Sequence, residues 1–139
     1  MTVQAILAPL FAQVLLTFAL MIWMAQTRFA AARAGKVTPN KGSPRTFGWP
    51  EKAQQVADSF HNQLELPPLF YVLVTLALVT KEADLLFVAM SWAFVASRYV
   101  HAYVHTGRNR TMTRFRCYFV GALILLAMWA IFAIRILAA

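Results

Sequence analysis

The chain has 139 residues, of which 60% are apolar and only 13% charged, and its mean hydropathy is +0.60. This composition argues against an ordinary soluble domain and predicts one integral membrane domain. The formal charge of +8 lies between hydrophobic segments, without a recognition motif, so we expect no nucleic-acid partner. Cys117 is the single cysteine, which excludes an intramolecular disulfide and a zinc site built on several thiolates.

The hydrophobic segments predict four membrane spans. The first helix is expected from Val3 to Thr27, which is long enough to cross a hydrocarbon layer of about 30 Å. We interpret it as an uncleaved helix, because no positive charge precedes it. A polar connection rich in Lys, Arg, Gly and Pro follows over residues 28–51. Three further helices, over residues 52–80, 85–105 and 112–137, complete a single four-span all-α domain covering residues 1–139.

The basic residues predict how these spans are oriented. Ten Lys or Arg residues lie in or beside the first and third connections, whereas the second connection carries only Lys81. Cytoplasmic loops of membrane proteins carry an excess of Lys and Arg. We therefore expect the first and third connections in the cytoplasm and both termini on the opposite side of the membrane.

Polar side chains recur along the predicted second span at steps of three and four, so they share one face of a helix. A carboxylate at the centre of a membrane helix costs at least about 2.5–3.5 kcal/mol on insertion scales, so it normally faces a partner or a wet cavity. Pro67 and Pro68 lack an amide hydrogen, which predicts a bend just beyond the last residue of the stripe. The stripe consists of Asp58, His61, Asn62 and Glu65.

The third and fourth spans supply cationic partners for this stripe. Arg98, His101 and His105 share one face of the third helix, and Arg114 and Tyr118 share one face of the fourth. The predicted topology brings all of these side chains to the cytoplasmic half of the bundle. The simplest pairing joins Glu65 to Arg98, and this pair would serve a structural role as readily as a functional one.

Other interpretations of these residues stay open. We interpret Arg114 as part of a pocket, because a guanidinium group at a pocket attracts anions and favours a thiolate. Arg108, Arg110 and Arg116 fit better as a collar that contacts lipid headgroups. His101 and His105 are four residues apart and could bind a metal together with His61, but spacing alone is weak evidence, and we favour interhelical hydrogen bonding or substrate contact.

These motifs resemble those of the membrane-associated proteins in eicosanoid and glutathione metabolism, the MAPEG superfamily, which includes microsomal glutathione transferases and prostaglandin E synthase. The likeness covers nearly the whole chain, with four spans in matching order. It rests on Asn62-x-x-Glu65 followed by Pro68-Leu69-Phe70, on Arg98-x-x-His101, on Arg114-x-x-x-Tyr118, and on Lys36-Val37-Thr38-Pro39 after the first span.

The resemblance implies a left-handed four-helix bundle that assembles as a homotrimer in a membrane, most simply the inner membrane of a bacterium. It implies a transferase or peroxidase of the glutathione transferase type, with glutathione as co-substrate and a lipophilic electrophile entering from the bilayer. Arg114 would stabilise the thiolate. The glutathione-binding positions would be Lys36, Asn62, Glu65, Arg98, His101, His105 and Tyr118, and no metal is implied.

Two positions depart from the pattern of the members that use glutathione. Asp58 stands where those members have an arginine, and His105 replaces a tyrosine. The alternative is therefore a non-enzymatic membrane protein of the same fold that binds lipid or a protein partner, with Glu65 and Arg98 purely structural.

Overall fold

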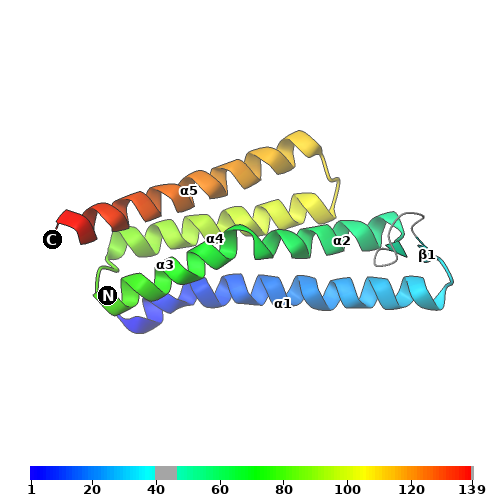
Figure 1. Cartoon of the computed structure of the whole chain (residues 1–139), viewed down its shortest axis with the longest axis horizontal. Helices are drawn as coiled ribbons and strands as arrows, with labels where there is room; N and C mark the ends of the chain where they lie inside the picture. The colour runs from blue at the N-terminus through cyan, green and yellow to red at the C-terminus, as the bar shows by residue number, and fades with distance from the viewer. Residues whose placement is uncertain (40–46, 139) are drawn as a thin grey trace.

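The computed structural model describes residues 1–39 and 47–138, and within them the chain is almost entirely helical (Figure 1). Lys41 and Arg45, two of the basic residues of the first predicted connection, lie outside the described residues. The elements in chain order are α1 (Val3–Arg33), β1 (Thr38–Pro39), β2 (Phe47–Gly48), α2 (Glu51–His61), the 3₁₀ turn η1 (Asn62–Leu64), α3 (Leu66–Thr80), α4 (Leu85–Thr106) and α5 (Thr111–Ala138).

The helices form an elongated bundle whose long axes run side by side (Figure 1). Among the described residues, four helical segments are long and apolar enough to cross a membrane, with α2, η1 and α3 together making the second. The start of α1 and the end of α5 lie at one end of the bundle, and the α4–α5 connection lies toward the other end, the one that carries β1 (Figure 1). This arrangement confirms the all-α four-helix bundle.

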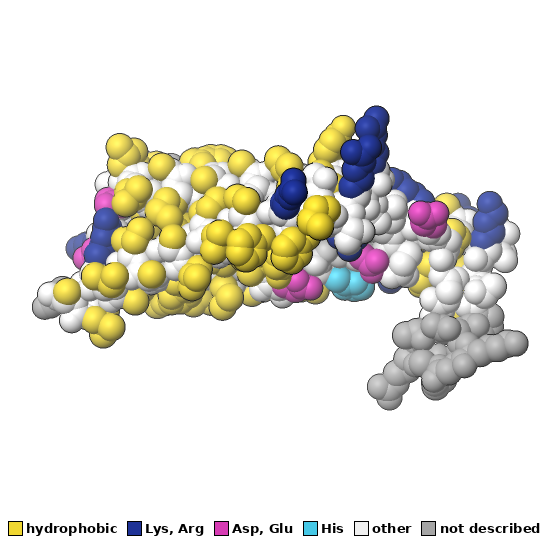
Figure 2. Space-filling model, turned by 90° about the horizontal axis from the view of Figure 1, so that it is seen from above, with side chains coloured by type: hydrophobic (Ala, Val, Ile, Leu, Met, Phe, Trp, Pro, Cys, Tyr) yellow, Lys and Arg dark blue, Asp and Glu magenta, His cyan; other side chains and the backbone are white. Residues whose placement is uncertain are grey.

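The side chains on the surface suit a bilayer. Figure 2 shows hydrophobic side chains over much of the long body of the bundle, with Lys and Arg gathered mainly toward one end. Large apolar side chains are exposed along the helices, including Leu15, Val79 and Leu126. Such a surface is costly in water and compatible with lipid.

Local chemistry sets where the helices begin and end. The Thr2 hydroxyl accepts a hydrogen bond from the Ala5 amide at 3.3 Å and caps α1. The Asp84 carboxylate accepts from the Phe87 amide at 2.8 Å and caps α4. The first helix continues to Arg33, six residues beyond the predicted end at Thr27, because the alanines near its end favour helix.

The second span is broken at the polar stripe. Helix α2 ends at His61, the 3₁₀ turn η1 follows, and Glu65 has φ −95° and ψ −79° before α3 begins. Pro67 lies in the first turn of α3, where its missing amide hydrogen costs no intrahelical bond. The bend therefore precedes the prolines and includes Glu65, instead of following it as the sequence predicted.

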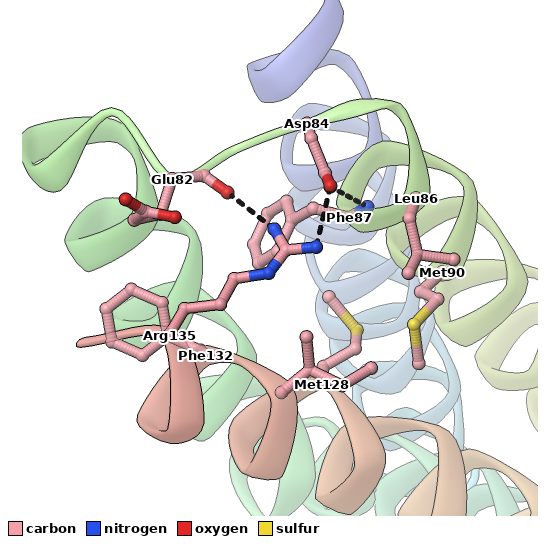
Figure 3. A pocket seen from close by; sticks show the side chains of 9 residues that line it. Glu82, Asp84, Leu86, Phe87, Met90, Met128, Phe132 and Arg135 are labelled. Carbon is pink, nitrogen blue, oxygen red and sulfur yellow. Dashed lines mark hydrogen bonds and ion pairs between the residues drawn. The ribbon is translucent and has the colours of Figure 1, made fainter. Parts of the chain in front are cut away.

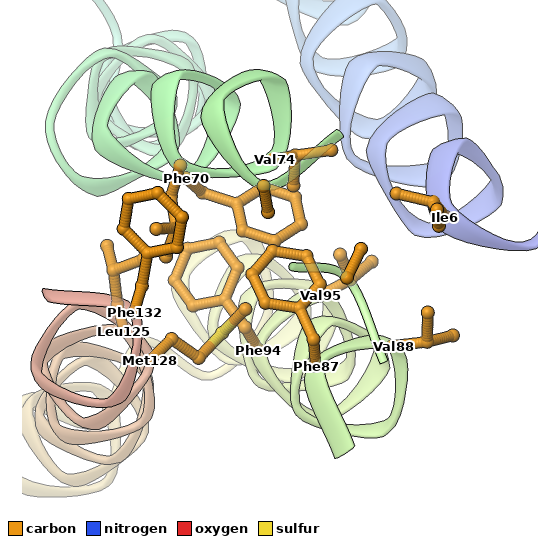
Figure 4. Close-up of a cluster of buried hydrophobic side chains, with 13 residues drawn as sticks. Ile6, Phe70, Val74, Phe87, Val88, Phe94, Val95, Leu125, Met128 and Phe132 are labelled. Carbon is orange, nitrogen blue, oxygen red and sulfur yellow. The ribbon is translucent and has the colours of Figure 1, made fainter. Parts of the chain in front are cut away.

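A buried aromatic and aliphatic cluster holds α3, α4 and α5 together (Figure 4). Phe70 and Phe94 are fully buried, and their ring centroids are 4.8 Å apart. Leu125, Met128 and Phe132 of α5 close the cluster. This packing fixes α5 relative to α3 and α4, so it also fixes the helix faces that carry the predicted site residues.

A polar contact lies between α1 and the broken second span. The Gln13 side-chain amide donates to the Gln63 amide oxygen at 3.0 Å, and Gln63 donates to the Ser59 carbonyl at 3.0 Å. Both glutamines are buried. Amide pairs of this kind join transmembrane helices that lack a hydrophobic driving force.

The end of the bundle that carries the chain termini is closed by an ion pair. Arg135 of α5 donates to the Asp84 carboxylate at 2.7 Å and lies near the Glu82 carbonyl at 3.4 Å (Figure 3). The pair joins the α3–α4 turn to the last turns of α5. Its location outside the apolar core suits an arginine that reaches the membrane interface.

Candidate functional site

The predicted polar side chains converge on one cleft, here called the polar cleft, with a volume of about 540 Å³. It lies in the half of the bundle nearest the α4–α5 connection. The helix break in the second span forms one wall, and facing turns of α4 and α5 form the others. The lining residues are Asp58, His61, Asn62, Glu65, His101, His105, Thr111, Arg114, Phe115 and Tyr118.

Tyr118 connects the two sides of the polar cleft. Its hydroxyl donates to Glu65 Oε2 at 2.9 Å, so the phenol joins α5 to the helix break. Its ring lies over the Arg98 guanidinium, 5.6 Å from the ring centroid, in a cation–π geometry. The Tyr118 side chain thus contacts the Glu65 carboxylate through its hydroxyl and the Arg98 guanidinium through the face of its ring.

Arg98 is fully buried and is anchored by the backbone. Its Nη2 donates to the Asn62 carbonyl at 2.8 Å, at the point where the second span leaves α-helical geometry. Its Nε and Nη1 have no hydrogen-bond partner among the described residues. Arg98 therefore lies beneath the polar cleft, where its guanidinium contacts the ring of Tyr118.

The predicted direct pairing of Glu65 with Arg98 is wrong. Within the described residues, the single ion pair is the one between Arg135 and Asp84. The helix break turns Glu65 to the exposed side, where it accepts from Tyr118, and turns the Asn62 carbonyl toward Arg98. The opposite charges are thus linked through the phenol and the backbone and not by contact.

The histidines of α4 form the floor of the polar cleft. His101 and His105 are 2% and 3% exposed, and their rings meet edge to face with centroids 5.6 Å apart. The Asn62 side-chain amide donates to His105 Nδ1 at 3.1 Å, which requires the tautomer with its proton on Nε2. No group of three His, Cys, Asp or Glu placed to hold a metal occurs in the part of the chain that the structure describes.

Arg114 lies one turn from Tyr118 on the same wall and is half-buried. One of its terminal nitrogens donates to the Asn109 side-chain oxygen at 2.8 Å. Asn109 adopts a left-handed conformation, with φ +48°, in the α4–α5 connection. This contact holds the guanidinium at the wall of the cleft while leaving its other donors for a ligand.

Most of the residues predicted for the site line the cleft. Asn62, Glu65, His101, His105, Arg114 and Tyr118 do so, Arg98 lies beneath Tyr118, and Lys36 is exposed beyond the end of α1 and is not a lining residue. Thr111 and Phe115 also line the cleft and were not predicted as site residues. Their spacing to Arg114 and Tyr118 at steps of three and four was the available signal.

The helices and the polar cleft define the class of protein: a multi-pass integral membrane protein whose four-helix bundle has a polar site in one half. The MAPEG family model matches residues 6–134, nearly the whole chain, so this chain belongs to the MAPEG family. Comparisons with curated proteins and with solved structures gave no match. Family membership makes it a membrane protein of the eicosanoid and glutathione metabolism type.

Proposed function

We propose that this protein is a membrane-bound glutathione-dependent transferase or peroxidase that acts on lipophilic electrophiles. One observation carries the proposal: Arg114 and the polar side chains of three helices meet in a single cleft inside a membrane bundle. A volume of about 540 Å³ suits a tripeptide, because small-ligand pockets measure roughly 300–1,000 Å³.

The chemistry of the cleft fits glutathione. Glutathione carries an ammonium group, two carboxylates and a thiol, so it needs partners of both charges. Glu65 supplies a carboxylate for the ammonium group, and Arg114 supplies a cation for the thiolate or a carboxylate. His101 Nδ1 is buried without a partner among the described residues, and a polar ligand in the cleft would provide one.

The residues of the chain would have distinct roles in the reaction. Arg114 stabilises negative charge on sulfur, which makes the thiolate available at neutral pH. Tyr118 and Asn62 orient the ligand, because Glu65 and His105 already fix their side chains. Phe115 is exposed beside Arg114 and offers an apolar approach for a lipophilic second substrate.

The proposal also covers the subunit assembly of the bundle and its orientation in the membrane. We infer a homotrimer, because the exposed apolar helix faces can pack against other copies as well as against lipid. The basic connections at the end nearest the polar cleft support a cytoplasmic location for that end, and thus termini on the outer side. A bacterial inner membrane would meet both conditions.

Titration calorimetry of glutathione into the detergent-solubilised full chain tests binding, and conjugation of a lipophilic chloronitrobenzene tests turnover. Arg114→Ala should lower the conjugation rate by at least about tenfold, as expected when one stabilising group is removed. Arg33→Ala is the matched control, because Arg33 is exposed at the end of α1 and does not line the cleft. The proposal is wrong if millimolar glutathione does not bind and Arg114→Ala conjugates at the rate of the parent protein.

The position of Asp58 favours a second candidate, a non-enzymatic protein that holds lipid or a protein partner. Asp58 brings a negative charge into the cleft and is held by the Gln54 side-chain amide at 2.7 Å. A fixed carboxylate there repels the carboxylates of glutathione. If this candidate holds, Glu65→Gln lowers the unfolding temperature and no conjugation is measured for the parent protein.

A further inference from the structure

A separate groove lies on the other face of α4 and α5. Its outer part, about 480 Å³, is lined by Tyr103, Val104, Gly107, Arg108, Arg110 and Thr113. Its inner part, about 280 Å³, is lined by Ser97, Val100, Arg116, Cys117 and Val120. We call the two parts together the α4–α5 groove. It shares no lining residue with the polar cleft.

Helical spacing places the two parts one after the other along the same two helices. On α4, Ser97, Val100, Val104 and Gly107 follow at steps of three and four, so they lie along one line of the helix. The corresponding line begins at Arg110, just before α5, and continues on α5 through Thr113, Cys117 and Val120. The groove therefore runs along the bundle from the α4–α5 connection into the membrane.

A close approach of the two helices closes the inner end of the groove. A Cβ atom added at Gly121 would lie 2.7 Å from Ser97 Oγ, so α4 and α5 nearly touch there. Small residues permit such contacts between membrane helices. From this point the groove extends ten residues along α4, from Ser97 to Gly107. That is about 15 Å at 1.5 Å per residue, the thickness of one leaflet of a hydrocarbon layer of about 30 Å.

Charge and polarity change along this length. Arg108 and Arg110 lie at the outer end, and Arg116 lies toward the inner part. No carboxylate lines either part, and the single ion pair of the described residues lies at the opposite end of the bundle. The inner surface is apolar and includes Val100 and Val120, both 51% exposed.

We propose that the α4–α5 groove binds one anionic glycerophospholipid of the surrounding bilayer. Its phosphate lies between Arg108 and Arg110, and one acyl chain lies along Val100 and Val120. The order of a basic outer end and a mainly apolar inner end, which Arg116 also lines, matches the order of headgroup and chain in a single leaflet. Tyr103, 81% exposed beside the arginines, suits the headgroup region, where tyrosine is enriched.

The charge of the groove distinguishes this lipid from other occupants. A zwitterionic lipid gains less from Arg108 and Arg110, which have no ion-pair partner among the described residues, because its own cation competes for the phosphate. A second copy of the chain would have to place carboxylates opposite the arginines. Of the five Asp and Glu residues in the sequence, Asp58, Glu65 and Asp84 already have hydrogen-bonded partners, which leaves Glu51 and Glu82 for such a contact.

Native mass spectrometry of the full chain, released from micelles that contain equal amounts of dioleoyl phosphatidylglycerol and dioleoyl phosphatidylcholine, measures this preference. The protein should retain phosphatidylglycerol at one molecule per chain. Arg108→Gln with Arg110→Gln should weaken retention by about tenfold or more, because each arginine near an anionic lipid adds to binding. The matched control is Arg33→Gln with Lys36→Gln, which removes two exposed charges near the end of α1 and leaves the groove intact.

The acyl chain is tested separately. Val120→Trp, at an exposed position, should fill the inner part of the groove and reduce retention of the dioleoyl lipid without lowering the unfolding temperature. Glycerol 1-phosphate should bind far more weakly than the lipid. Equal losses in the two double variants would show a general basic collar, and equal binding of glycerol 1-phosphate would show a free anion site. A change of subunit number in Val120→Trp would show a groove covered by another copy, and each of these results overturns the proposal.

Discussion

The hydrogen bond from Tyr118 to Glu65 gives the sharpest test of the polar cleft. Tyr118→Phe removes the hydroxyl that donates to Glu65 at 2.9 Å and keeps the ring over Arg98. A hydrogen bond to a charged group contributes about 1.5–3 kcal/mol net. Because Glu65 is exposed and water can replace the phenol, we expect the free energy of unfolding to fall by about 1 kcal/mol.

A double-mutant cycle isolates this contact from the rest of the cleft. Tyr118→Phe, Glu65→Gln and the double variant are compared with the parent protein by denaturant unfolding in detergent. The coupling free energy between the two positions should be about 1 kcal/mol. Tyr103→Phe is the control, since Tyr103 is 81% exposed and should lose almost nothing.

A coupling free energy below about 0.3 kcal/mol would refute this reasoning, because additive effects mean that the two side chains do not interact. A loss in Tyr103→Phe equal to that in Tyr118→Phe would refute it as well. The hydroxyl would then act through general solvation instead of a specific contact between α5 and the helix break.

Three further expectations concern stability. Arg135 holds the pKa of the Asp84 carboxyl below its usual value, so the stabilisation is complete above the unfolded-state pKa of about 3.9 and is lost as pH falls through the folded-state pKa. Asp84→Asn should remove this part of the acid sensitivity in thermal unfolding scans. Phe94→Ala should cost about 3–5 kcal/mol by opening a cavity in the buried cluster, measured by denaturant unfolding. Gln13→Leu should cost about 1–2 kcal/mol because it orphans the Gln63 amide oxygen, and adding Gln63→Leu should recover most of that loss in the same assay.

The architecture was predictable because the local composition of each span is typical of a membrane helix. A run such as Val3–Thr27 has no alternative to a membrane helix, and helical spacing alone places His101 with His105 or Arg114 with Tyr118 on one face. The sequence also indicates which end of the bundle carries the polar residues, since the first and third connections are rich in Lys and Arg and the second carries only Lys81. These inferences need only the period of the helix and the cost of burying polar groups.

The partners within the cleft were not predictable to the same degree. Spacing along a regular helix places Glu65 opposite Arg98. The 3₁₀ turn between His61 and Glu65 rotates the chain, so Arg98 donates to the backbone carbonyl of Asn62 instead of the Glu65 side chain. Lys36 was assigned to the site by resemblance, and its exposed position depends on how the chain leaves α1, which no periodic pattern encodes.

The backbone anchor of Arg98 has a consequence for redesign of the cleft. Because this arginine holds the Asn62 carbonyl, its fixation does not depend on which side chain occupies position 62. Substitutions such as Asn62→Ser or Asn62→His therefore change the side chain beside His105, while Arg98 keeps its hydrogen bond to the backbone carbonyl of residue 62. Position 62 is thus a suitable site for a substitution library that varies the chemistry of the polar cleft.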